Sequence, residues 1–407
     1  MAGEETFKGA RALWLRVHRY LGLGIAGFLV LSGSTGAFIA FEREVDAALN
    51  PELYYAESRG RPALPLEALV ERLEAGFTSA RVRAIALPQN ARDIALVRLH
   101  ARAEAGPLDV DEAFVDPYSG EILGARLRKA VRFDRPHLVP MIREFHESLY
   151  LGSIGEWLLG GFAFAWFVSG LIGFYLTLPG RRSFIGRWRK SWLVARKRLT
   201  FDLHRAGGLW CLGLMLVVSA SGLYLSIGDF VVRPLVSQLA PLTEPPGQSL
   251  PRSEQELPSR LTFDEALVTA RRHLPATAAH HRPAKVHYLV SQQAFRVDFV
   301  GDASGSWAAL PAEQFFIDAG SGAPLAGFGY LQGTAADKLL LLQLPLHSGK
   351  ILGSLGQATI LVFGLVTVAL SVTGLMIWWR RRSARQRSHD KRRATATRSE
   401  KRLPLTP

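Results

Sequence analysis

The sequence predicts an α-helical membrane protein with four transmembrane helices in two pseudo-symmetric halves and two outer α+β domains. Three observations support this fold class: long uncharged segments, basic residues clustered beside them, and motifs that recur at matching positions in both halves. Each uncharged segment reaches the ~20 residues that a helix needs to cross a ~30 Å hydrocarbon core. The four segments are residues 20–41, 157–178, 206–227 and 351–379.

Basic residues gather at the two ends of the chain and in its middle. Segments 1–19, 180–205 and 380–407 hold 24 of the 49 Lys and Arg residues but only 5 of the 35 Asp and Glu residues. Because basic segments beside membrane spans remain in the cytoplasm, we expect both termini and the central loop there. The net charge of +14 therefore indicates contact with lipid headgroups, and we expect no nucleic-acid partner.

The chain divides near residue 200 into halves with the same order of parts: a span, an outer domain and a second span. The expected parts are 1–41 (cytoplasmic N-terminus and helix 1), 42–145 (first outer domain), 146–179 (helix 2), 180–203 (basic cytoplasmic loop), 204–228 (helix 3), 229–346 (second outer domain), 347–380 (helix 4) and 381–407 (basic disordered cytoplasmic tail). We expect helix 1 to be an uncleaved anchor, because no small-x-small cleavage site ends its long apolar run.

Both outer domains show the pattern of a small α+β unit. Apolar residues recur every three or four positions in 64–75 and 261–273, which predicts an amphipathic helix in each domain. The alternating segments 91–101 and 293–301 then predict half-buried strands.

Four histidines precede the spans in a repeated register. His18 and His204 each lie 18 residues before a glycine of the following span, and His146 and His347 each lie 27 residues before one. An imidazole at the end of a membrane helix is an available axial ligand for haem iron, and two such rings form a bis-histidine site. The repeated spacing therefore predicts that these four histidines bind haem iron.

Topology divides the histidines into two pairs. His18 and His204 begin spans that start inside, whereas His146 and His347 precede spans that start outside. Eighteen helical residues cover roughly 27 Å, so an inner and an outer histidine cannot share one iron. The one cysteine, Cys211, lies within a span, which excludes covalent haem attachment through Cys-x-x-Cys-His. We therefore predict two non-covalently bound b-type haems, and no catalytic residue is assigned.

Small residues recur in every span. They occur as SGSTG at 32–36, SGLIG at 169–173, SASG at 219–222 and SVTG at 371–374. Glycine and serine allow the close approach of a helix or of a flat macrocycle. Helix packing is the favoured interpretation, so these residues are not assigned to the haem site.

Each outer domain ends in a predicted hairpin, in which a strand reaches Asp116 or Asp318 and a Ser-Gly turn follows. Helix, strand and hairpin of this kind resemble the PepSY module, whose pattern Asp-x-x-[Ser/Thr]-Gly is matched by these aspartates with Gly120 and Gly322. With this module between spans, the chain from about residue 10 to 382 resembles the PepSY-associated transmembrane family of bacterial inner-membrane proteins. The resemblance implies periplasmic outer domains and, from members that are siderophore–iron reductases, a haem-dependent ferric reductase.

The expected function is electron transfer from the cytoplasmic side to a ferric siderophore in the periplasm, with release of ferrous iron. Since the one GxGxxG match, at 22–27, lies within an apolar span and follows no strand, it is not a nucleotide site. Electrons would then come from membrane quinol or from a separate cytoplasmic flavoprotein. Two alternatives stay open: a haem-free PepSY adaptor or sensor that binds a periplasmic partner, and a haem reductase acting on copper, flavin or a protein.

Overall fold

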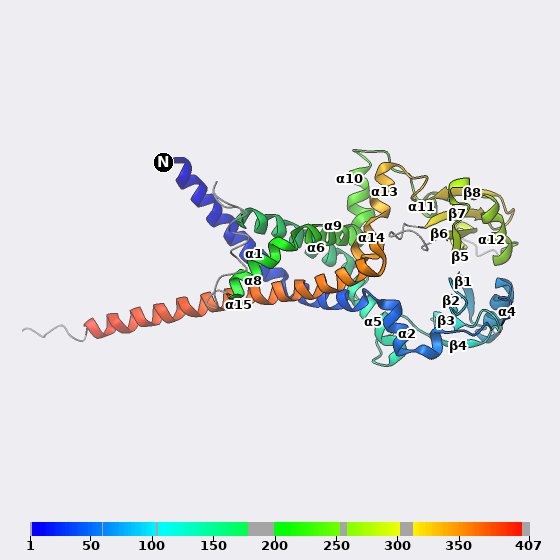
Figure 1. Ribbon diagram of the computed structural model, residues 1–407, viewed down its shortest axis with the longest axis horizontal. Helices are drawn as coiled ribbons and strands as arrows, with labels where there is room; N and C mark the ends of the chain where they lie inside the picture. Colours follow the sequence, from blue (N-terminus) through cyan, green and yellow to red (C-terminus); the bar gives the residue numbers. More distant parts are fainter. Residues whose placement is uncertain are drawn as a thin grey trace, which may run out of the picture. The chain divides into compact units, whose positions relative to one another are not determined.

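The computed structural model describes residues 2–58, 60–102, 105–177, 199–252, 259–301 and 312–400. The chain divides into two compact units, whose elements are labelled in Figure 1. The helical unit contains Met1–Ala37, Gly160–Leu223 and Leu361–Pro407, and the sheet unit contains Phe38–Leu159 and Tyr224–Ile360.

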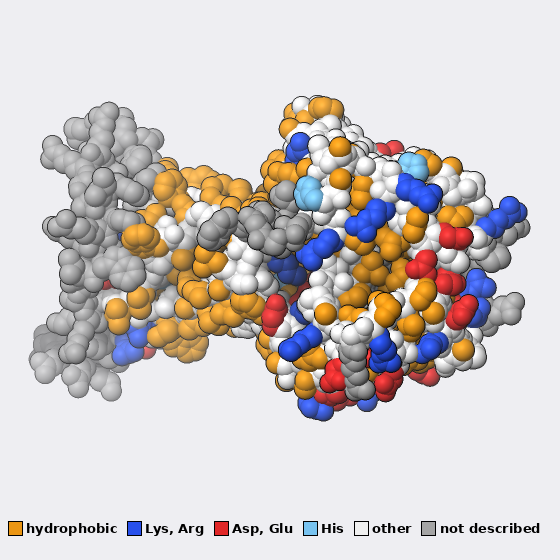
Figure 2. Space-filling view, turned by 45° about the vertical axis from the view of Figure 1, so that its right-hand side comes forward, with side chains coloured by type: hydrophobic (Ala, Val, Ile, Leu, Met, Phe, Trp, Pro, Cys, Tyr) orange, Lys and Arg blue, Asp and Glu red, His pale blue; other side chains and the backbone are white. Residues whose placement is uncertain are grey.

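Among the residues that the structure describes, four helices are long and apolar enough to cross a membrane, and they lie at the four predicted spans. They cover Gly9–Ile39, Ser153–Thr177, Leu212–Val236 and Lys350–Asp390. The long helices are α1 (Ala2–Ile39), α6 (Ser153–Thr177), α8 (Leu199–Trp210), α9 (Leu212–Ile227) and α15 (Gly353–Glu400). Figure 2 shows apolar side chains over the surface of the helical unit, as a lipid-facing surface requires.

The third predicted span is divided between α8 and α9 at Cys211. The Cys211 N–H donates to the Gly207 carbonyl at 3.0 Å, and the Cys211 carbonyl accepts from the Met215 N–H at 2.8 Å. Backbone hydrogen bonding therefore continues through the division.

The fourth helix is longer than the sequence predicts. Disorder was expected over 381–407, whereas α15 continues to Glu400, and residues 401–407 lie outside the described part of the chain. A span already supplies the helical nucleus, so the Arg-, Ala- and Gln-containing segment after it only has to propagate the helix. Most of the predicted basic loop, residues 180–203, also lies outside the described residues, because the description resumes at residue 199.

Glycines bring α1 and α15 into close contact. A Cβ atom on Gly33 would lie 2.9 Å from the Gly364 carbonyl oxygen, and one on Gly364 would lie 2.6 Å from the Gly33 oxygen. Any larger residue at either position would separate the two backbones. The small-residue motif at 32–36 therefore serves helix packing, as predicted.

The sheet unit is built around one antiparallel sheet of eight strands in the order β4-β3-β2-β1-β5-β6-β7-β8. The strands are β1 (Ala80–Ala86), β2 (Ala95–Ala101), β3 (Glu112–Val115), β4 (Ile122–Arg126), β5 (Arg282–Leu289), β6 (Ala294–Val300), β7 (Glu313–Asp318) and β8 (Pro324–Phe328). Each half of the chain supplies four of them. The sequence predicts separate outer domains over 42–145 and 229–346, but β1 pairs with β5 and joins them. This pairing satisfies the backbone groups that each four-stranded edge would leave open.

Two helices cover one face of the sheet. Helix α4 (Leu66–Gly76) packs on β1, and α12 (Phe263–Arg272) packs on β5, β6 and β7. A capping box of Thr262 and Glu265 begins α12. The fully buried side chains of Leu73, Ile85 and Val286 belong to one apolar core that both halves share.

Both predicted hairpins are present, β3–β4 in the first half of the chain and β7–β8 in the second. Asp116 accepts hydrogen bonds from the backbone of the turn between β3 and β4, and Asp318 does so between β7 and β8. Gly120 and Gly322 have φ angles of 72° and 75°, a left-handed conformation that favours glycine. Sequence and structure therefore agree on these turns.

Shorter helices connect the sheet to the spans. They are α2 (Glu42–Leu49), α3 (Pro51–Tyr54), α5 (Arg135–Ser148), α10 (Arg233–Val236), α11 (Pro246–Ser249), α13 (Ala335–Leu341) and α14 (Gln343–Ser348), with a π turn η1 (Gly228–Val232) and the 3-10 turns η2 (Ala276–Ala278), η3 (Val290–Gln292) and η4 (Lys350–Leu352).

Candidate functional site

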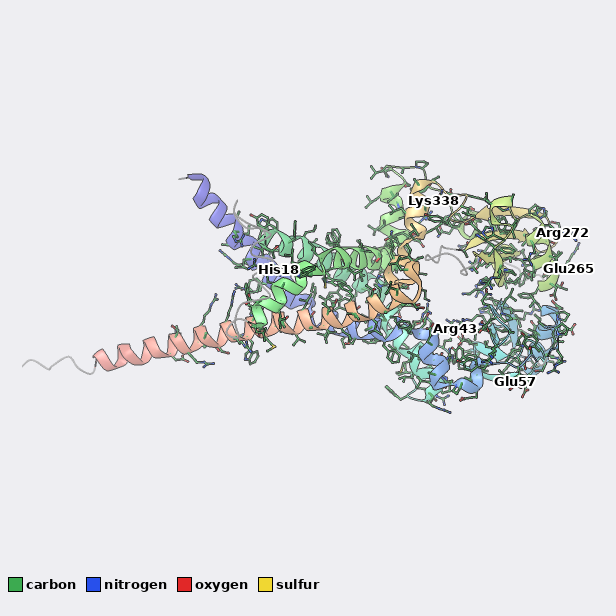
Figure 3. The ribbon with its side chains drawn as sticks, viewed as in Figure 1. His18, Arg43, Glu57, Glu265, Arg272 and Lys338 are labelled. Carbon is green, nitrogen blue, oxygen red and sulfur yellow. The ribbon has the colours of Figure 1, made fainter. Side chains whose placement is uncertain are left out.

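The first histidine pair lies within the helical unit. His18 is on α1, where Figure 3 labels it, and His204 is on α8. The structure brings their imidazole rings to 6.5 Å between centroids, with the ring planes 62° apart. The residues that the sequence pairs are therefore neighbours, and both side chains are half-buried.

Both rings of this pair are held through Nδ1. His18 Nδ1 lies 3.1 Å from the Ser169 carbonyl oxygen on α6, and His204 Nδ1 lies 2.9 Å from the Leu370 carbonyl oxygen on α15. Because a carbonyl oxygen only accepts, we infer that each Nδ1 carries the hydrogen and each Nε2 carries the lone pair. That tautomer is the one that binds a metal through Nε2.

A glycine lies against each of these rings. A Cβ atom on Gly173 would lie 3.3 Å from His18 Cε1, and one on Gly374 would lie 3.2 Å from His204 Cε1. Each glycine is four residues beyond the carbonyl that holds the same ring. The small-residue motifs at 169–173 and 371–374 therefore make room for imidazoles, a role that the sequence analysis did not assign to them.

The second histidine pair lies within the sheet unit, in the last turns of α5 and α14. The ring centroids of His146 and His347 are also 6.5 Å apart, with the planes inclined by 53°. Tight corners follow both helices: a Cβ atom on Gly155 would overlap the Ser148 carbonyl, and one on Gly356 would overlap the Gly349 carbonyl. These corners fix each histidine-bearing helix end against the helix that follows it.

One carboxylate connects the segments that carry the second pair. Glu42 Oε2 accepts from Arg143 Nη1 at 2.7 Å, and Glu42 Oε1 lies 3.6 Å from Lys350 Nζ. Arg143 precedes His146 by three residues, and Lys350 follows His347 by three. Partial burial lowers the pKa of Arg143, but Glu42 and another carboxylate raise it further, so the net shift is upward. Glu42 therefore acts on both histidine-bearing segments.

The ring separation leaves room for one metal ion between the two imidazoles of each pair. A ring nitrogen lies ~1.1 Å from the centre of its own ring. With ring centres 6.5 Å apart, the nitrogens of the two rings are therefore at least roughly 4 Å apart, which exceeds the ~3 Å of a hydrogen bond. A metal–imidazole bond of ~2.0 Å gives almost the same spacing, with centroids roughly 6 Å apart. The gap in both pairs thus has the size of a nitrogen–metal–nitrogen bridge.

Two imidazoles alone form an incomplete site for a bare ion. Among the residues that the structure describes, no group of three or more His, Cys, Asp or Glu side chains could hold a metal ion. Haem supplies four equatorial nitrogens of its own and needs only two axial ligands, so a histidine pair fits it. Each pair, His18 with His204 and His146 with His347, has the composition and spacing for one haem.

Sequence reasoning missed the residues that hold the rings. The sequence gives no signal for Ser169, Gly173 or Gly374, because glycine and serine are common wherever membrane helices pack. It gives none for Glu42 either. The sequence does show that Gly173 and Gly374 follow His146 and His347 at the same distance. However, each glycine contacts the ring of a different histidine, which lies on another helix.

No curated protein matches the chain. A family model describing the PepSY-associated TM region matches residues 15–381, which include the whole sheet, two of the candidate spans completely and most of the other two. The chain therefore belongs to the family of the PepSY-associated TM region.

Proposed function

We propose that the protein is a di-haem reductase of the bacterial inner membrane that passes electrons from the cytoplasmic side to a periplasmic acceptor. The observation that carries the proposal is the pair of bis-histidine arrangements, each with ring centroids 6.5 Å apart. The four histidines His18, His204, His146 and His347 would be the axial ligands of two b-type haems. Haem held in this way supplies one-electron transfer.

The distribution of charge supports the direction of transfer. Basic residues flank the ends of the spans that the sequence assigns to the cytoplasm, which would place His18 and His204 on that side. His146 and His347 then belong to the periplasmic side, together with the sheet unit. The matching element order of the two halves supports a pseudo-symmetric arrangement in which equivalent histidines meet.

The chain's own residues orient the ligands. Carbonyls of Ser169 and Leu370 fix the tautomer of the first pair, and hydrogen bonds of this kind strengthen imidazole as a ligand. Gly173 and Gly374 allow each ring to lie against its neighbouring helix. Helix corners and Glu42 position the second pair.

A ferric siderophore is the proposed acceptor. Ferric iron is held by hard oxygen ligands, and reduction to ferrous iron weakens such a chelate and releases the metal. This choice rests on characterised reductases of the family that the chain resembles. Membrane quinol or a cytoplasmic flavoprotein is the proposed electron donor.

The test is the absorption spectrum of the purified full chain with and without dithionite. We expect a reducible low-spin spectrum with about two haems per chain. His146→Ala and His18→Ala should each remove roughly one haem, whereas His100→Ala, at an exposed position of β2, should remove none. A colourless but folded preparation would contradict the reductase and favour a haem-free adaptor.

A further inference from the structure

The sheet has a second face that α4 and α12 do not cover, and it carries a row of charged side chains. In the strand register Glu112 pairs with Arg98, Arg98 with Ala84, Ala84 with His287, and His287 with Arg296. Directly paired residues of antiparallel strands point to the same face. One row therefore runs from β3 across the β1–β5 junction to β6.

The alternation of the strands separates this row from the apolar core. In each strand the residue next to a member of the row is fully buried in the core beneath α4 and α12. These neighbours are Val97, Ile85, Val286 and Val297. Successive side chains of a strand point to opposite faces. The charged row must therefore lie on the face away from those helices.

Three cations define this face. Arg98 lies 2.9 Å from Glu112, and Arg296 lies 2.9 Å from Asp298. Each guanidinium has five N–H donors, so these contacts leave further donors available. Lys285 is exposed, and among the described residues no carboxylate lies within ion-pair distance of its ammonium group.

His287 adds no positive charge to the row. Its pKa is lowered, first by burial and then by the neighbouring cations, against the opposing effect of Asp298. Arg296 Nη2 lies 2.9 Å from His287 Nε2, a contact in which a neutral imidazole accepts. The cations of β2, β5 and β6 that could contact a ligand on this face are thus Arg98, Lys285 and Arg296, and two of them also contact carboxylates of the row.

The charged face lies on the same side of the sheet as the helix that carries His146. Arg126 continues the row on β4, and its Nη1 donates to Asp46 of α2 at 2.7 Å and to the Pro136 carbonyl of α5 at 2.6 Å. The charged face therefore lies on the side of the sheet that contacts α5, the helix that carries His146.

We propose that this charged face binds the acceptor as a small anionic iron chelate, with Lys285 as the principal unneutralised contact and Arg98 and Arg296 as further donors. Oxygen-rich chelates of the catecholate or carboxylate type are negatively charged and fit these donors, whereas chelates with a pendant ammonium group do not. The identification of the ligand as an iron chelate rests on the proposed function. The preference for an anion rests only on the cations of the face.

The experiment measures binding of redox-inert gallium(III) chelates to the purified full chain in detergent. One probe is an anionic gallium tricatecholate, and the other is a gallium trihydroxamate with a pendant ammonium group. We expect the anionic probe to bind roughly tenfold more tightly at low salt, with the preference falling as salt rises.

Two matched variants test the residue assignment. Lys285→Gln should weaken binding of the anionic probe about fivefold, whereas Arg272→Gln should leave it unchanged. Arg272 is an exposed cation on α12, labelled in Figure 3, on the covered side of the sheet. Circular dichroism of both variants checks that the sheet is retained.

Equal affinity for the two probes, or equal effects of the two substitutions, would overturn the proposal. The haem spectrum of the same samples separates this failure from failure of the proposed function. Haem-containing protein without anion preference contradicts only the binding face. Colourless protein that retains the preference and its dependence on Lys285 supports the face and contradicts the reductase.

Discussion

The histidines of the first pair are positioned by backbone carbonyls, by neighbouring hydroxyl groups and by glycines. His18 is held by a backbone carbonyl and by the absence of a side chain at Gly173. A ligand whose ring is fixed before metal binding loses little freedom when the bond forms. Removing that fit should therefore affect one haem while the other stays in place.

Gly173→Val is expected to displace His18, because even a Cβ atom would lie 3.3 Å from Cε1 and valine adds two methyl groups. The variant should lose roughly half of its bound haem, since outer contacts of this kind change metal affinity ~10- to 100-fold. Pyridine haemochrome assay of purified protein measures this loss.

Gly161→Val is the matched control in the same helix, because a Cβ atom there meets no other atom within 4 Å. It should retain about two haems per chain. Equal haem contents for the two variants would show that Gly173 does not position His18.

Sequence predicts which histidines lie together better than it predicts the residues that hold their rings. A polar imidazole at the end of an apolar segment stands out, and the repeated spacing of His146 and His347 strengthens the signal. Gly173 resembles Gly33, yet Gly33 packs against a helix backbone and Gly173 against a ring. The difference depends on which helix approaches, and that is a tertiary property.

Among the elements, local pattern suffices for some strands and fails for others. Helices α4 and α12, strands β2 and β6, and both hairpins follow from apolar spacing and turn residues. Strand β1 does not, because a bulge at Arg83 places Val82 and Ile85 on the same buried face although they are three residues apart. An irregularity between Pro283 and Lys285 interrupts β5 in the same way.

Ile85→Ala tests whether the β1–β5 junction makes the sheet one cooperative element. Ile85 is fully buried and pairs with Val286 across the junction, so truncation should cost about 2–5 kcal/mol of unfolding free energy. Hydrogen exchange with mass spectrometry should show protection falling together in β2–β4 and β6–β8.

Val268→Ala provides the comparison, because this α12 side chain is 49% exposed and its truncation should change protection little. Loss of protection confined to β1–β4 in Ile85→Ala would mean that the halves are independent domains, as the sequence alone predicts.

For the whole molecule, the four spans follow directly from hydropathy and length, whereas the side of the membrane depends on charge. Basic residues at the chain ends and in the middle predict a cytoplasmic location for them. The sheet unit would then be periplasmic. The joining of both halves in one sheet adds that they must lie on the same side of the membrane, since hydrogen-bonded strands cannot be separated by a bilayer.

Cysteine labelling tests this orientation in a Cys211→Ser background, which removes the single native thiol. We expect Arg272→Cys on α12 to react with an impermeant maleimide in intact spheroplasts. Arg385→Cys on α15 should react only after the membrane is disrupted, because both positions are exposed and the proposed topology places them on opposite sides. The reverse pattern would contradict the proposed direction of electron transfer.

The pairing of β1 with β5 also means that one edge of β1 stays unpaired during synthesis until β5 has been made. About 195 residues separate the two strands, so at roughly 5–20 residues per second β1 waits some 10–40 s for its partner while two spans enter the membrane. During that interval its backbone edge is open to pairing with other chains. Arg81 and Arg83 lie just before the segment Ala84–Ala86 that pairs with β5, and β1 is irregular between Val82 and Ala84; charge and irregularity of this kind discourage such pairing. The strand that later joins the two halves thus has features that oppose aggregation of the nascent protein.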